Sequence, residues 1–132
     1  MNEFSHRTFK LWAYTVSHSF LILRSPMLFE DLDGYSSETD YNIDIEFTAV
    51  EYLDVPYKFT SLKICELLGD VIPLRLQFYS LKLGFKTFQL QTDEGCYYIV
   101  AGSYRIGKNR WVSESRINNP SLEYDEILGT SG

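Results

Sequence analysis

The stretch that decides the fold is Asn42-Ile43-Asp44-Ile45-Glu46-Phe47-Thr48-Ala49-Val50. Apolar residues occupy its odd positions from 43 to 49, whereas Asp44, Glu46 and Thr48 occupy the even positions. Successive side chains of a β-strand point to opposite faces of the sheet. The alternation therefore predicts a strand with an apolar inner face and an acidic outer face in solvent.

Similar short segments recur along the chain and predict a fold built almost entirely of strands. Residues 7–16 and 20–24 flank the polar turn Ser17-His18-Ser19, and residues 85–92 and 96–101 flank Asp93-Glu94-Gly95. Both pairs are typical of β-hairpins. Residues 74–79 alternate in the same way and predict a further strand, whereas residues 60–68 fit a strand or a short helix, with the strand favoured.

The last quarter of the chain carries turn and helix signals. Gly107-Lys108-Asn109 predicts a turn before a strand over residues 110–112. Asn119-Pro120 is typical of an N-cap followed by proline at the first helical position. Residues 122–128 therefore predict a short helix, inside a segment 118–132 that is either helical or frayed.

The fold class expected from these segments is all-β. With 132 residues, the chain 1–132 predicts a single domain, and its 16% aromatic content suits pleated, half-buried surfaces. We expect an antiparallel β-sandwich or open barrel of about seven to nine short strands. The predicted core comprises Phe9, Leu11, Ile22, Ile43, Ile45, Phe47, Leu74, Leu76, Phe78, Phe88, Leu90 and Ile99.

The charge distribution predicts a protein partner. No Lys or Arg occurs from Ser25 to Tyr57, yet this region holds nine of the eighteen acidic residues. A one-signed surface steers partners of opposite charge, so we expect docking of a basic protein. The residues proposed for this contact are Asp31, Asp33, Asp40, Asp44, Glu46, Glu51 and Asp54, with Tyr35, Tyr41 and Tyr52 as apolar anchors.

Basic residues gather instead between positions 75 and 116. Two interpretations stay open: the two regions form opposite poles that drive self-association, or they pair within one sheet and balance each other. The acidic balance, with a pI of about 4.8, argues against nucleic acid as a partner. The longest apolar run, residues 20–23, is far too short to cross a membrane.

Catalytic and metal-binding patterns are missing from the sequence. Aligning Gly34 with the glycine of a calcium loop places Phe29 where a carboxylate is required. His6, His18, Cys65 and Cys96 show no paired ligand spacing, and no nucleophile motif or phosphate-binding loop is present. We therefore expect a non-enzymatic protein without metal or cofactor. We also expect it to be cytoplasmic, because no signal-peptide pattern opens the chain and the two cysteines make no disulfide framework.

An alternative function is the binding of a small molecule or carbohydrate. Trp12 and Tyr14 share the parity opposite Phe9 and Leu11, so they either face solvent or belong to a strand buried on both faces. Exposed aromatics, with Trp111, suit ligand stacking. In size, acidity and β content the chain also resembles the small proteins that neutralise bacterial toxins, although no particular residues carry this likeness. The resemblance implies an immunity-like role.

Overall fold

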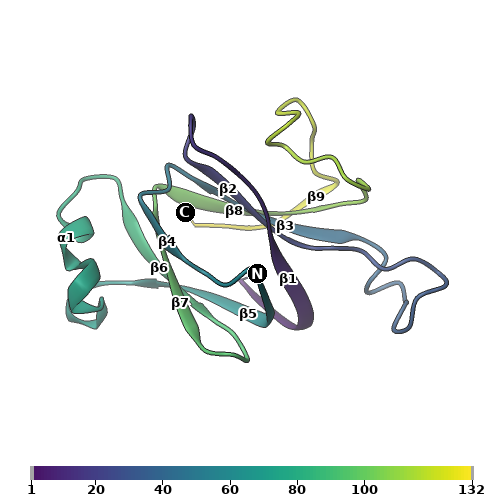
Figure 1. Cartoon of the computed structure of the whole chain (residues 1–132), viewed down its shortest axis with the longest axis horizontal. Helices are drawn as coiled ribbons and strands as arrows, with labels where there is room; N and C mark the ends of the chain where they lie inside the picture. The colour runs from purple at the N-terminus through teal and green to yellow at the C-terminus, as the bar shows by residue number, and fades with distance from the viewer. Residues whose placement is uncertain (1, 132) are drawn as a thin grey trace.

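The computed structural model describes residues 2–131 and confirms an all-β fold (Figure 1). The described residues form nine strands: β1 (Glu3–Thr15), β2 (Phe20–Ser25), β3 (Asn42–Thr48), β4 (Tyr52–Asp54), β5 (Lys58–Leu67), β6 (Lys86–Gln91), β7 (Cys96–Ala101), β8 (Ser103–Asn109) and β9 (Glu126–Thr130). They make one antiparallel sheet in the order β4-β7-β6-β5-β1-β2-β3-β8-β9. The edge strands β4 and β9 are not paired with each other, so the sheet remains open.

The sheet curls so that its inner face encloses one hydrophobic core. Phe47 of β3 and Phe88 of β6 are separated by three strands in the sheet, yet their ring centroids lie 5.9 Å apart. Tyr104 of β8 also contacts Phe88, at 5.1 Å. Strong right-handed twist and β-bulges allow an antiparallel sheet to curl in this way. Residues far apart in the sheet therefore share one core.

Most of the predicted core and hairpins are confirmed. The pairing of β1 with β2 and of β6 with β7 reproduces the two expected hairpins, and residues 60–68 lie largely in strand β5. Nine of the predicted core residues are buried: Phe9, Ile22, Ile43, Ile45, Phe47, Leu76, Phe88, Leu90 and Ile99. Leu11 is half-buried and packs against the core.

The strand predicted over residues 74–79 is wrong. This region forms a 3-10 turn, η2 (Leu74–Leu76), continuing into the short helix α1 (Gln77–Ser80), after an earlier 3-10 turn, η1 (Gly69–Val71). Leu74 and Phe78, predicted to be buried, are 85% and 67% exposed. Positions i and i+4 share a face in a strand and also in a helix, so the spacing of Leu74 and Phe78 fits both periods.

Two predictions near the C-terminus are also wrong. The helix predicted over residues 122–128 does not form, because Glu126–Thr130 pairs with β8 as strand β9. Position 132, the end of that predicted segment, lies outside the described residues. Gly107 lies inside β8 rather than in a turn, and residues 110–112 form no strand.

The segment 110–125 connects β8 to β9 and covers the outer face of β2, β3 and β8. The ring of Tyr124 lies over Gly107, where a Cβ atom would come within 2.3 Å of it. Trp111 stacks on Tyr124 with a centroid distance of 5.3 Å. The outer face of β3 is thereby buried like its inner face. Within residues 2–131, no helix is both long and apolar enough to cross a membrane.

Candidate functional site

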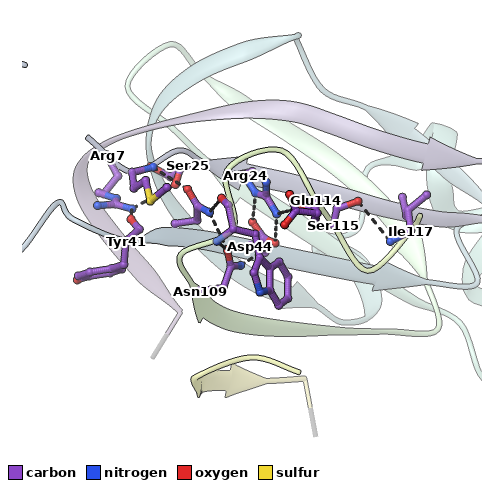
Figure 2. Close-up of polar contacts among 12 residues, drawn as sticks. Arg7, Arg24, Ser25, Tyr41, Asp44, Asn109, Glu114, Ser115 and Ile117 are labelled. Carbon is purple, nitrogen blue, oxygen red and sulfur yellow. Dashed lines mark hydrogen bonds and ion pairs between the residues drawn. The ribbon is translucent and has the colours of Figure 1, made fainter. Parts of the chain in front are cut away.

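The acidic side of β3 contains a buried ion pair. Asp44, which is 0% exposed, accepts hydrogen bonds from Nε and Nη2 of Arg24 at 2.6 and 2.8 Å. The side-chain amide of Asn109 donates to Oδ2 of Asp44 at 3.0 Å. Figure 2 shows Arg24 facing Asp44, with the carbonyl of Glu114 accepting from the same guanidinium group at 2.8 Å.

Burial and pairing act on Asp44 in opposite directions. Removal from water raises the pKa of Asp44, while the hydrogen bonds and positive charge of Arg24 and the amide of Asn109 oppose that rise. The indole of Trp12 covers the Arg24 guanidinium at 4.7 Å. The pair is thus a sealed structural element and has no access to a partner protein.

Glu46 is the second buried carboxylate of β3, at 3% exposure. It accepts from Arg105, which lies directly opposite on β8, at 2.8 Å and from Arg116 at 3.0 Å. Tyr124 lies beside these groups, with Arg105 and Arg116 within 6.0 Å of its ring. The prediction that Asp44 and Glu46 form a solvent-facing acidic surface is therefore wrong, because segment 110–125 covers them and three arginines neutralise them.

The other predicted acids at the strand ends are also paired with bases. Asp40 forms an ion pair with Arg110 at 2.8 Å, and Asp54 with Arg75 at 3.1 Å. Glu51 pairs with Lys82. Five of the nine acids between Ser25 and Tyr57 thus have basic partners within the same chain, and four of these five acids pair with bases of the region 75–116. Of the two open interpretations of the charge split, pairing between the two regions accounts for four of these acids, and the fifth, Asp44, pairs with Arg24.

The remaining four acids lie in one loop between β2 and β3. This acidic loop, residues 28–39, is closed by the hydrogen bond from the Leu28 amide to the Thr39 carbonyl at 2.8 Å. Glu30, Asp31, Asp33 and Glu38 are exposed, and none forms an ion pair with another described residue. Figure 1 shows the loop, in dark blue, extending from one end of the molecule.

The base of the acidic loop is fixed to the sheet. Arg7 of β1 donates to the carbonyls of Tyr41 at 2.8 Å, Ser25 at 3.2 Å and Glu38 at 3.3 Å. Figure 2 shows Arg7 reaching between Ser25 and Tyr41. Asn42 adds a bond from the Met27 amide to its Oδ1 at 2.7 Å. The loop therefore projects its acids from an anchored base.

Apolar side chains alternate with the acids of this loop. Phe29, Leu32 and Tyr35 are 51%, 45% and 37% exposed. Of the three tyrosines predicted as anchors, only Tyr35 lies in the loop. Tyr41 is half-buried, with Arg7 and Lys108 over its ring, and Tyr52 is held by hydrogen bonds with Asp54 and Arg75. Phe29 and Leu32 were missed, because their sequence carries no signal apart from their position among acids.

The aromatic residues predicted to bind a ligand do not converge. Trp12 is packed under Arg24, and Trp111 is stacked on Tyr124. Tyr14, at 40% exposure, is the one that reaches solvent appreciably. A cleft of about 310 Å³ at the base of the acidic loop is lined by His6, Arg7, Lys10 and Lys58 among others, with no Phe, Tyr or Trp. This cleft does not supply the stacking platform that the ligand-binding alternative requires.

The histidines and cysteines remain dispersed. His18 bonds to its neighbour Ser17 in the exposed β1–β2 turn, and His6 is exposed on β1. Cys65 and Cys96 are free thiols. Among residues 2–131, no three His, Cys, Asp or Glu side chains are grouped so that they could hold a metal ion.

No protein-family model, curated protein or solved structure matches this chain.

Proposed function

We propose that the protein is a non-enzymatic binding domain that docks a basic protein through the acidic loop, residues 28–39. The observation that carries the proposal is the combination in this loop of four unpaired carboxylates with three exposed apolar side chains. The chain has a net charge of −6, and the loop contributes four negative charges and no positive ones. The loop therefore presents negative charge at a place where an apolar contact is also available.

The two kinds of side chain serve different stages of binding. Unpaired carboxylates accelerate the encounter with a basic surface, chiefly at low salt. Desolvation of a few large apolar side chains supplies most of the affinity. Phe29, Leu32 and Tyr35 supply such anchors beside the acids, which suits a partner that carries an apolar pocket rimmed by Lys and Arg.

The proposal keeps the partner-neutralising, immunity-like role but moves it to different residues. Asp31, Asp33 and Tyr35 keep their proposed contact roles, and Glu30, Glu38, Phe29 and Leu32 are added to them. The two free thiols support the reducing cytoplasm as the compartment. Dispersed histidines and cysteines support a function without catalysis.

The test begins with affinity capture of the partner from the native host and continues with binding kinetics. Asp31→Lys with Asp33→Lys is expected to slow association with the captured protein at least tenfold at low salt, since reversing these two charges changes the net charge at the contact by four units. Glu123→Lys with Asp125→Lys is the matched control, because these exposed acids lie outside the loop and form no ion pair with another described residue. If both variants slow association equally, the loop acts only through the net charge of the protein. If neither variant changes the association rate, the loop is not part of the contact.

A further inference from the structure

The connection between β5 and β6 exposes an unusual amount of apolar surface. We call residues 68–84 the apolar segment. Six of its large hydrophobic side chains are between 67% and 99% exposed: Leu68, Val71, Leu74, Phe78, Leu81 and Leu83. Single exposed hydrophobic residues are ordinary, but six in one short segment mark an interaction site.

The helical turns of this segment arrange part of that surface as one face. Leu74 in η2, Phe78 in α1 and Leu81, the C-cap residue of α1, are spaced i, i+4 and i+7, which is the spacing of residues on one side of an α-helix. Ile72 and Leu76 are 5% and 1% exposed, and they hold the segment to the rest of the molecule. The apolar face therefore points outward, because Ile72 and Leu76 instead pack the segment against the rest of the molecule.

The apolar segment carries little unpaired charge, and Asp70 is its one acid. The two bases of the apolar segment are already neutralised within the chain, Arg75 by Asp54 and Lys82 by Glu51. Interfaces between copies of one chain are similarly apolar and depleted of free charge at their centre. The face therefore suits another apolar surface and has no preference for a strongly charged one.

We propose that the apolar segment binds the same segment of a second copy, around a two-fold axis. A two-fold contact joins one patch to itself, so a single self-complementary apolar face is sufficient. Six large side chains expose an area on the order of several hundred Å², and a stable interface buries roughly 800 Å² from each partner. The six side chains and the backbone between them thus approach the area that a dimer needs.

The position of the acidic loop favours this arrangement. Figure 1 shows α1 at one end of the long axis of the molecule and the acidic loop at the other end. A dimer joined through the two apolar segments directs both acidic loops away from the contact, which minimises repulsion between two chains of charge −6. It also leaves both acidic loops accessible.

Sedimentation velocity tests the proposal on the whole chain. At about 50 µM the wild type is expected to sediment as a dimer, and Leu74→Gln with Phe78→Gln and Leu81→Gln is expected to weaken the dimer at least tenfold. The matched control is Val16→Gln with Tyr57→Gln and Val112→Gln, which changes three side chains that are 84%, 68% and 69% exposed elsewhere. The control is expected to remain dimeric. Far-UV circular dichroism and thermal unfolding verify that each variant is folded.

A second variant keeps the test decisive if the triple substitution fails to fold. Phe78→Arg alone places two like charges face to face across the two-fold axis and is expected to yield a folded monomer. A wild type that is monomeric at about 100 µM would overturn the proposal. The proposal is overturned in the same way if the monomer binds lipid vesicles or another protein through this face. A dimer that persists in both Phe78→Arg and the triple variant would also overturn it.

Discussion

The carboxylate of Asp44 lies in the interior with three donors around it. Two come from Arg24 and one from Asn109, and the indole of Trp12 closes the site above the guanidinium. Transferring both charges out of water is costly, so the pair is tolerable only while each partner satisfies the other. At the scale of the residue, Asp44 is therefore a requirement of the fold.

Asp44→Asn should be strongly destabilising, because it leaves the Arg24 charge buried without a counter-ion. We expect a loss of about 3–5 kcal/mol in the free energy of unfolding, measured by urea denaturation. Arg24→Met combined with Asp44→Asn should recover part of that loss, since no charge is then left buried. Asp40→Asn is the control: it breaks the more exposed pair with Arg110 and should cost less than about 1 kcal/mol. Similar costs for the two single variants would contradict the buried-pair argument.

Tyr124 should make stability sensitive to alkaline pH. Its pKa is raised well above the ordinary value of 10.0, first by burial and then by the negative charges of Asp44 and Glu46. The unfolded chain releases the phenol proton at about pH 10, whereas the folded chain retains it, so raising the pH through this range favours unfolding. The stabilising contribution is thus complete below about pH 10 and is lost above it.

The variant Tyr124→Phe isolates this contribution. Between about pH 9 and pH 11, its free energy of unfolding should fall less steeply than that of the wild type, by up to about 1.4 kcal/mol per pH unit. Urea denaturation across this range measures the slope. Tyr14→Phe, at a residue 40% exposed, is the control. Parallel slopes for the wild type and Tyr124→Phe would show that the phenol is not protected.

At the scale of the element, segment 110–125 determines the character of the sheet's outer face. It supplies the Glu114 carbonyl to Arg24, Arg116 to Glu46 and the Tyr124 ring to Gly107. The alternation correctly predicted strand β3 and an inner face with Ile43, Ile45 and Phe47, whereas Ala49 lies beyond the strand and is exposed. It could not predict a cover for the outer face, because this cover comes from residues 60 or more positions later and has no regular periodicity.

Gly107 offers a direct test of how this segment packs. A Cβ atom at position 107 would lie 2.3–2.5 Å from three atoms of the Tyr124 ring, so Gly107→Ala must displace the ring. We expect a cost of about 1–3 kcal/mol, as for other overpacked sites. In a Tyr124→Ala background the same substitution should cost much less, since the space is then free. Additive free energies of unfolding in this double-mutant cycle would contradict the contact.

Other elements show the same limit on prediction from sequence. The hairpins β1–β2 and β6–β7 were predictable because each turn and its two strands are adjacent in sequence. Residues 74–80 were not, because the spacing of Leu74 and Phe78 satisfies a strand and a helix alike. In β1, the register shift between Leu11 and Ala13 takes Trp12 out of simple alternation. The odd–even alternation of the sequence therefore could not predict that the Trp12 indole lies beside Arg24.

At the scale of the whole molecule, the sequence showed where the acidic residues are concentrated, but it could not predict which basic residues pair with them. The acidic region 25–57 is real, yet its strand-borne acids lie opposite or near the bases of distant segments, as Glu46 does opposite Arg105. Within region 25–57, only the four acids of the acidic loop form no ion pair with another described residue, because this loop projects from the sheet beyond its anchored base. Seven of the ten residues predicted for the partner contact are therefore engaged in contacts within the chain, and the acidic loop, which holds the other three, became the candidate contact.

The dimer proposed above should respond to salt in the opposite way from binding through the acidic loop. Two copies that each carry a charge of −6 repel one another, and salt screens this repulsion without weakening the apolar contact. Sedimentation velocity at about 50 mM and 500 mM NaCl should therefore show tighter self-association at the higher concentration. A head-to-tail contact between an acidic loop and the bases of the next copy would instead dissociate as salt rises. The variant Asp31→Asn with Asp33→Asn distinguishes the two arrangements further. It should strengthen the two-fold dimer slightly at low salt, because it removes negative charges that repel each other. It would abolish a head-to-tail contact, which depends on these charges.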